Sequence, residues 1–133
     1  MEVFEQYKKL VDECNQLERM INSKESWIYA VKLKPLVNPD LIEELQLELE
    51  QLVGSFYEKY CESLKVAMEI ESSIEALHDP EARTLMRLRY IERMEWVEIG
   101  EVLYCSRTKC YRLHKKALNQ FQEINKTLKK HET

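Results

Sequence analysis

The sequence is poor in residues that interrupt helices. Its 133 residues include only two glycines and three prolines, while 44% are hydrophobic and a third are charged. Such a composition is typical of a nearly all-helical protein. The sequence contains no apolar run long enough to span a membrane and no apolar signal segment at its start. We therefore expect an all-α, cytoplasmic protein that does not associate with membranes.

The common signatures of catalysis and metal binding are also missing. There is no Gly-rich phosphate loop, no GxSxG motif and no cluster of histidines with acids. The four cysteines form no CxxC pair, which favours free thiols over a disulfide or metal framework. Cys110 and His114 have a spacing that suits a metal pair, but Cys110 falls at a position expected to be buried. We expect no enzymatic activity, no metal and no other cofactor.

The net charge of −4 is distributed unevenly along the chain. Residues 1–77 carry 8 Lys and Arg against 16 Asp and Glu, whereas residues 78–133 carry 12 against 8. Within residues 106–130 there are eight cations and a single anion, Glu123. An acidic half and a basic half usually have different roles, and the basic half is the candidate for binding a polyanion.

Hydrophobic periodicity divides the chain into helices. Apolar residues recur every three or four positions from residue 1 to about 33, and again from about 40 to 77. The two runs are separated by a short link that ends in the helix-start signal Asn38-Pro39-Asp40, so they should form an antiparallel hairpin. Tyr57 and Tyr60 are expected to pack at helix–helix contacts. Because the second helix is longer than the first, part of its apolar stripe needs another partner.

A second start signal, Asp79-Pro80-Glu81, predicts a new helix over residues 80–91. A fourth helix is expected over residues 96–103, and a fifth begins after Ser106, a good N-cap. We therefore predict two domains. Residues 1–77 would form a helical hairpin for oligomerisation, and residues 78–133 a three-helix module.

Residues 96–121 have the residue pattern of a helix-turn-helix. Such a motif needs a buried aliphatic residue followed by a small one, then buried residues in the turn and along the second helix. The positions that fit this pattern are Ile99, Gly100, Leu103, Cys105, Cys110 and Leu113. The turn position that usually holds glycine is Tyr104. Because an aromatic residue is costly at positive φ, we expect the turn to follow another path.

The exposed side of the fifth helix, residues 106–121, is then the predicted recognition surface. The first turns of such a helix enter the DNA major groove, where Arg can bind guanine and Thr can contact base edges. We assign base contacts to Arg107, Thr108, Lys109 and Arg112, and either base or phosphate contacts to Tyr111. Phosphate contacts are assigned to Ser106, Lys115 and Lys116.

The passage from Leu77 to Phe121 resembles region 4 of bacterial sigma-70-type sigma factors. The resemblance rests on Met86-Arg87-Leu88-Arg89-Tyr90, on Glu98-Ile99-Gly100, and on the spacing of Ser106, Cys110, Leu113 and Ala117-Leu118. The complete layout is similar to that of phage-encoded RinA/ArpU-like transcription regulators, in which a helical segment precedes a sigma-4-like helix-turn-helix. This resemblance implies a cytoplasmic regulator of phage late genes.

Three hypotheses follow. The first is a sequence-specific regulator of transcription that binds double-stranded DNA as a dimer or higher oligomer through its N-terminal helices. The second is a component of DNA packaging similar to a small terminase subunit, which also joins a helix-turn-helix to an oligomerisation region. The third is an interaction module that binds RNA polymerase without reading DNA. The first agrees best with the basic segment and the helix-turn-helix pattern.

Overall fold

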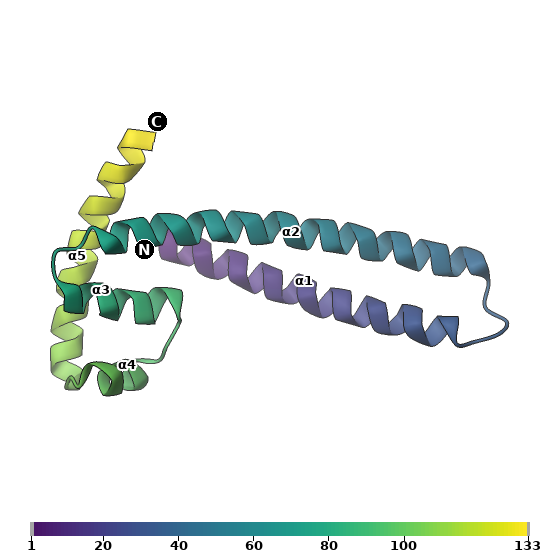
Figure 1. The fold of residues 1–133 in the computed structure, drawn as a ribbon, viewed down its shortest axis with the longest axis horizontal. Helices are drawn as coiled ribbons and strands as arrows, with labels where there is room; N and C mark the ends of the chain where they lie inside the picture. Colours follow the sequence, from purple (N-terminus) through teal and green to yellow (C-terminus); the bar gives the residue numbers. More distant parts are fainter. Residues whose placement is uncertain (1, 133) are drawn as a thin grey trace. The chain divides into compact units, whose positions relative to one another are not determined.

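The described part of the chain, residues 2–132, consists of helices joined by short connections and contains no strand (Figure 1). In this computed structural model the elements are, in order, α1 (Glu2–Lys32), α2 (Pro39–Glu75), α3 (Pro80–Met86), the π-helical turn η1 (Arg87–Ile91), α4 (Trp96–Leu103) and α5 (Arg107–Glu132). The predicted all-α class is confirmed. No helix of the described residues is long and apolar enough to cross a membrane.

The chain forms two compact units, residues 1–65 and 66–133. This division lies twelve residues before the predicted boundary between residues 77 and 78. The reason is visible in the core, because Ile70, Ile74 and Leu77 are at most 1% exposed and belong to the second unit. The last part of α2 therefore contributes to the C-terminal core, and this is one of the partners that its apolar stripe needed.

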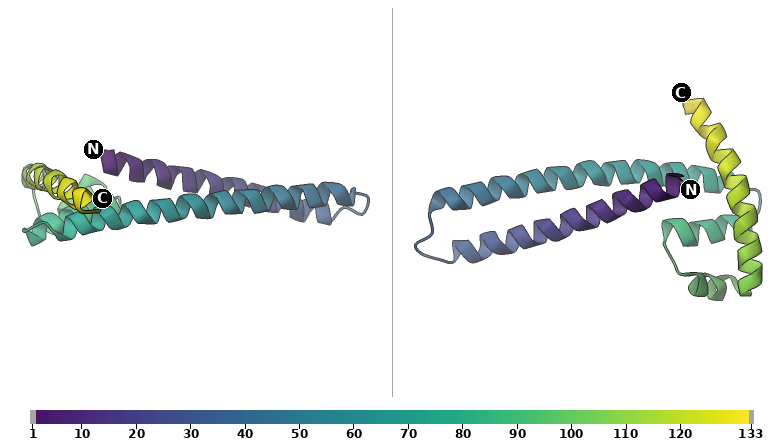
Figure 2. Two further views of the ribbon diagram at one scale, coloured as in Figure 1. Left: turned by 90° about the horizontal axis from the view of Figure 1, so that it is seen from above. Right: turned by 180° about the vertical axis from the view of Figure 1, so that it is seen from behind.

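The first unit is the predicted antiparallel hairpin of α1 and the first part of α2 (Figures 1 and 2). Asn38 Oδ1 accepts a hydrogen bond from the amide of Asp40 at 2.9 Å, which fixes the start of α2. Ion pairs bridge the two helices, from Lys24 to Glu48 at 2.8 Å and from Lys59 to Glu13 at 3.3 Å.

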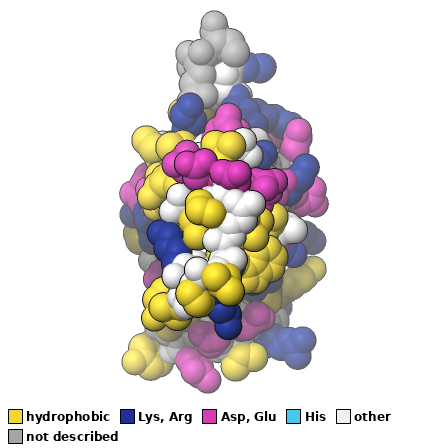
Figure 3. Space-filling model, turned by 90° about the vertical axis from the view of Figure 1, so that its right-hand side faces the viewer, with side chains coloured by type: hydrophobic (Ala, Val, Ile, Leu, Met, Phe, Trp, Pro, Cys, Tyr) yellow, Lys and Arg dark blue, Asp and Glu magenta, His cyan; other side chains and the backbone are white. Residues whose placement is uncertain are grey.

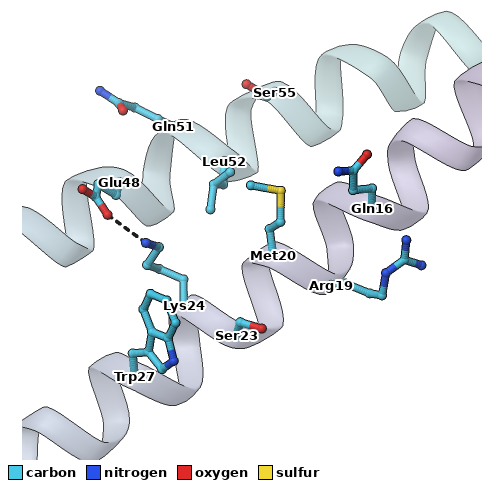
Figure 4. Close-up of a pocket in the computed structure, with 10 residues that line it drawn as sticks. All are labelled: Gln16, Arg19, Met20, Ser23, Lys24, Trp27, Glu48, Gln51, Leu52 and Ser55. Atoms are coloured by element: carbon cyan, nitrogen blue, oxygen red, sulfur yellow. Dashed lines mark hydrogen bonds and ion pairs between the residues drawn. The ribbon is translucent and has the colours of Figure 1, made fainter.

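Packing within this hairpin is thin. No residue of α2 between Pro39 and Glu62 is buried. A groove of about 560 Å³ lies between the helices. In this groove Met20 of α1 points toward Leu52 of α2, and Trp27 of α1 lies beside Lys24 (Figure 4). Hydrophobic side chains are also exposed at the tip of the hairpin (Figure 3), among them Tyr29, Leu33, Leu36 and Leu41. The expectation that Tyr57 and Tyr60 pack is wrong within the chain, since they are 60% and 44% exposed.

The second unit is more tightly packed. Fully buried side chains come from the end of α2 and from α3, α4 and α5, including Leu85, Met86, Ile99 and Phe121. Asp79 caps α3 by accepting a hydrogen bond from the amide of Glu81. Arg87 of η1 pairs with Glu71 and Glu75 of α2. The helical segment predicted over residues 80–91 is present, with its second half wound as a π-helix.

One buried hydrogen bond joins α5 to α2. Asn125 Nδ2 donates to Ser73 Oγ at 3.0 Å, and the two residues are 9% and 0% exposed. A buried hydroxyl that loses its partner is costly, because water does not replace the lost hydrogen bond. This pair therefore stabilises one particular alignment of α5 along α2.

We expect Asn125→Ala to lower the free energy of unfolding by about 1–3 kcal/mol, because it leaves the Ser73 hydroxyl unpaired. Urea denaturation of the whole chain measures the change. The double variant Ser73→Ala/Asn125→Ala should lose less than the sum of the two single variants, since both remove the same bond. Strict additivity would contradict this interpretation.

Candidate nucleic-acid interface

α4 and α5 form a helix-turn-helix joined by the three residues Tyr104–Ser106. Ile99 is fully buried, and Gly100 follows it within α4. A Cβ atom at Gly100 would lie 3.2 Å from the carbonyl oxygen of Cys105 and 4.0 Å from Cys110 Sγ. The small residue predicted at this position therefore fits the close approach of the turn, since a larger side chain would require the Cys105 carbonyl to shift by a few tenths of an ångström.

Tyr104 adopts the left-handed conformation, with φ 52° and ψ 43°. The expectation that the turn avoids this path is wrong. Two backbone hydrogen bonds hold Tyr104 in this left-handed conformation. The amide of Cys105 donates to Gly100 O at 2.9 Å, and the amide of Tyr104 donates to Glu101 O at 3.4 Å. These bonds satisfy carbonyl groups at the end of α4. The Tyr104 side chain is 94% exposed, so its packing does little to offset the strain of a positive φ.

Side-chain contacts from neighbouring elements hold the start of α5. Ser106 Oγ accepts a hydrogen bond from the amide of Lys109 at 3.1 Å, which confirms its predicted role as N-cap. Glu81 of α3 accepts a hydrogen bond from Cys105 Sγ at 3.3 Å and pairs with Lys109 Nζ at 3.4 Å. The carboxylate of Glu81 therefore ties α3 to both the turn and the first turn of α5.

α5 has one buried side and one exposed side. Cys110 is 4% exposed, and Ala117 and Phe121 are fully buried. All eight residues predicted to contact DNA are exposed: Ser106, Arg107, Thr108, Lys109, Tyr111, Arg112, Lys115 and Lys116. The helix-turn-helix pattern thus identified correctly which positions of α5 point away from the core.

These eight residues do not form one uniform surface. Thr108, Arg112 and Lys115 follow at steps of four and three, which places them in one row on the exposed side. Arg107 and Lys116 lie at opposite borders of that side. Lys109 is directed toward Glu81, so part of its charge is already compensated. Asn119 is exposed and continues the central row, although it was not among the predicted residues.

A cluster of four side chains, one of them from α5, was not predicted from the sequence. The Tyr90 hydroxyl lies 2.7 Å from His114 Nε2, and the Trp96 ring meets the His114 ring edge to face with centroids 4.5 Å apart. Arg89 stacks on Trp96 at 4.8 Å and donates to Met94 O at 3.0 Å. Only the spacing of Cys110 and His114 drew attention to this histidine, and the four residues come from η1, α4 and α5. The cluster joins these three elements and so fixes the direction of α5.

Burial lowers the pKa of His114 from its ordinary value of 6.5, and the positive charge of Arg89 lowers it further. Burial also raises the pKa of the Tyr90 hydroxyl. In the folded protein at neutral pH the imidazole is therefore uncharged, and the protonated tyrosine can donate to Nε2. Within the described residues, no three His, Cys, Asp or Glu side chains come together as a metal site.

The fold and this surface define an all-α helix-turn-helix protein with a long helical hairpin at its N-terminal end. A family model described as "Protein of unknown function (DUF1492)" matches residues 40–122. The match covers more than half of the chain and includes α2 and the helix-turn-helix, so the protein belongs to this family. Neither the curated proteins nor the solved structures yielded a match.

We expect Tyr104→Gly to raise the free energy of unfolding by up to about 1 kcal/mol, because glycine adopts positive φ without steric cost. Tyr104→Ala serves as the control. It removes the side chain but keeps the strained backbone, so it should change stability much less. Both values come from urea denaturation, and a loss of stability with glycine would show that the tyrosine ring itself stabilises the turn.

The lowered pKa of His114 predicts a pH dependence of stability. The unfolded chain takes up this proton near pH 6.5, before the folded chain does, so stability falls as the pH drops below that value toward the lower folded pKa. We expect the loss between about pH 7.5 and about pH 5 to be smaller in His114→Gln than in the natural chain. Urea denaturation at both pH values tests this, and equal losses in the two proteins would contradict it.

Proposed function

We propose that this protein is a sequence-specific double-stranded DNA-binding regulator of transcription. One observation carries the proposal. The segment Ser106–Gln122 contains five cations and no acid, and all five cations are exposed on a helix whose opposite side is buried. A rigid helix with its positive charge on one side suits the major groove of DNA, where phosphates line both edges.

The roles within this surface follow from position along and around α5. Arg107 and Arg112 lie in the first two turns, where a helix that enters the groove meets base edges. Thr108 lies between them and is short enough to contact a thymine methyl group. Lys115 and Lys116 lie farther along the helix, at a distance suited to phosphates. Lys109 is best placed to neutralise Glu81, whose carboxylate would otherwise repel the DNA backbone close to the recognition surface.

Three observations support our proposal of a role in transcription. They are the helix-turn-helix geometry, the capped start of α5, and the resemblance of residues 77–121 to sigma region 4. Control of phage late genes is the setting that the resemblance suggests, and we propose it on that ground alone. DNA binding itself is proposed on the charge and exposure of α5, independently of the resemblance.

The proposal is tested by selecting duplexes from a random DNA pool with the full chain, then measuring affinity for selected and unselected duplexes as a function of salt. Arg112→Ala should reduce discrimination between these duplexes by about 1–3 kcal/mol. Lys116→Ala should weaken binding to all duplexes and flatten the salt dependence by about one unit of slope.

Lys9→Ala is the matched control, because it removes one exposed cation from the hairpin and should change neither quantity. If Arg112→Ala left binding to every duplex unchanged, the assignment of α5 as the recognition helix would be wrong. A ring of eight or more subunits in solution would favour the DNA-packaging hypothesis instead.

A further inference from the structure

An ion pair lies at one border of the proposed recognition surface. Lys109 Nζ is 3.4 Å from Oε1 of Glu81, a residue in the first turn of α3. The segment Ser106–Gln122 contains five cations, and among the described residues Lys109 is the only one of the five that pairs with an acid. A DNA phosphate that approaches this lysine therefore competes with a carboxylate of the protein itself.

The contact between Lys109 and Glu81 is loose. Its length of 3.4 Å exceeds the roughly 2.7–2.9 Å of a strong hydrogen bond between an ammonium and a carboxylate. The side chains of Lys109 and Glu81 are 61% and 39% exposed, so water screens the attraction between them. Ion pairs with this exposure contribute little to stability. Another anion can therefore take the place of Glu81 at little cost to the fold.

Glu81 keeps a second partner when Lys109 leaves. The thiol of Cys105 donates a hydrogen bond to the same oxygen, Oε1, at 3.3 Å. Burial raises the pKa of this thiol, and the hydrogen bond to Glu81 raises it further, so Cys105 stays protonated at neutral pH and continues to donate. With this bond and its exposure to water, the Glu81 carboxylate remains stabilised without the lysine.

Lys109 lies on the border of α5 that also carries Lys116. The two residues are seven positions apart, which is close to two full turns of the helix. Arg112 lies nearer the centre of the exposed side. Because phosphates line both edges of the major groove, a cation at the border of a recognition helix is placed to contact the DNA backbone. The position that suits Lys116 to a phosphate therefore suits Lys109 as well.

We propose that a backbone phosphate of bound DNA takes the place of Glu81 as the partner of Lys109, and that Glu81 thereby lowers the affinity for every DNA sequence. The inference rests on the proposed function and assigns Lys109 to a phosphate, in place of the base contact expected from the sequence. A duplex presents many phosphates, whereas Glu81 presents one exposed carboxylate, so the DNA attracts the lysine more strongly. Binding then breaks one ion pair and leaves a carboxylate close to the DNA.

Lys109→Ala tests the exchange of partners, with the affinity of the full chain for selected and unselected duplexes measured as a function of salt. We expect weaker binding to both duplexes by the same factor and a salt dependence flatter by about one unit of slope, because one phosphate contact is lost. If Glu81 kept Lys109 in the complex, Lys109→Ala would leave the slope unchanged and Glu81→Gln would steepen it. Either result, or a loss of discrimination between the duplexes, overturns the proposal.

Glu81→Gln tests the effect of the acid. We expect affinity to rise about two- to fivefold for all duplexes with an unchanged salt slope, because the competing partner and its repulsion are removed. Glutamine has the same shape and can still accept the hydrogen bond from Cys105, so circular dichroism should show an unchanged helix content. Glu44→Gln is the matched control, since it removes an exposed acid of the hairpin. Equal gains in the two variants would mean that net charge alone explains the effect, and would overturn the proposal.

The double variant Glu81→Gln/Lys109→Ala separates the ion pair from simple repulsion. Glu81→Gln should raise affinity less in the Lys109→Ala chain than in the natural chain, because no ion pair remains to be broken there. An equal gain in both chains contradicts the proposal. A chain that binds no duplex at any salt concentration overturns DNA binding and this inference together. The expected effects of Arg112→Ala and Lys116→Ala, combined with an unchanged slope in Lys109→Ala, overturn this inference alone.

Discussion

Burial of one side of α5 is the interaction on which the C-terminal unit depends. Cys110, Ala117 and Phe121 extend the core of α3 and α4 along this helix, and Asn125 bonds to Ser73 of α2. The same helix carries the cations on its other side. Because the buried side cannot rotate without exposing Phe121, the orientation of Arg112 and Lys115 is set by packing rather than by any contact of their own. The proposed binding surface is thus the exposed side of a helix whose other side forms part of the core.

Two sets of polar contacts add to this support. The Glu81 carboxylate links the start of α3 to the turn and to Lys109, and the Tyr90–His114 contact links η1 to the middle of α5. Both involve residues that are close in space but far apart in sequence. Together with Arg89 on Trp96 they hold α4 and α5 against each other, so the proposed recognition surface is preorganised.

Much of this arrangement could be predicted from the sequence. Helical periodicity and the two Pro-containing start signals located the helices, because both reflect local backbone preferences. The buried positions Ile99 and Cys110 followed from the helix-turn-helix spacing. Three features could not be predicted. Packing against Ile70 and Ile74 decides the unit boundary, hydrogen bonds of the turn carbonyls hold Tyr104 at positive φ, and the cluster around His114 depends on how three elements meet. Each depends on contacts between different elements of the fold, so a local sequence pattern does not predict it.

The Ser73–Asn125 hydrogen bond has a consequence for how the protein would read DNA. It lies in the core, far along α5 from Arg107 and Arg112, yet it defines the axial register of a continuous helix. Sliding α5 by one turn would move its side chains by 5.4 Å, which corresponds to roughly one and a half base-pair steps of B-DNA. The hydrogen bond between Asn125 and Ser73 therefore fixes the position of α5 along its axis. Under the proposed function, it determines which base pairs Arg107 and Arg112 contact.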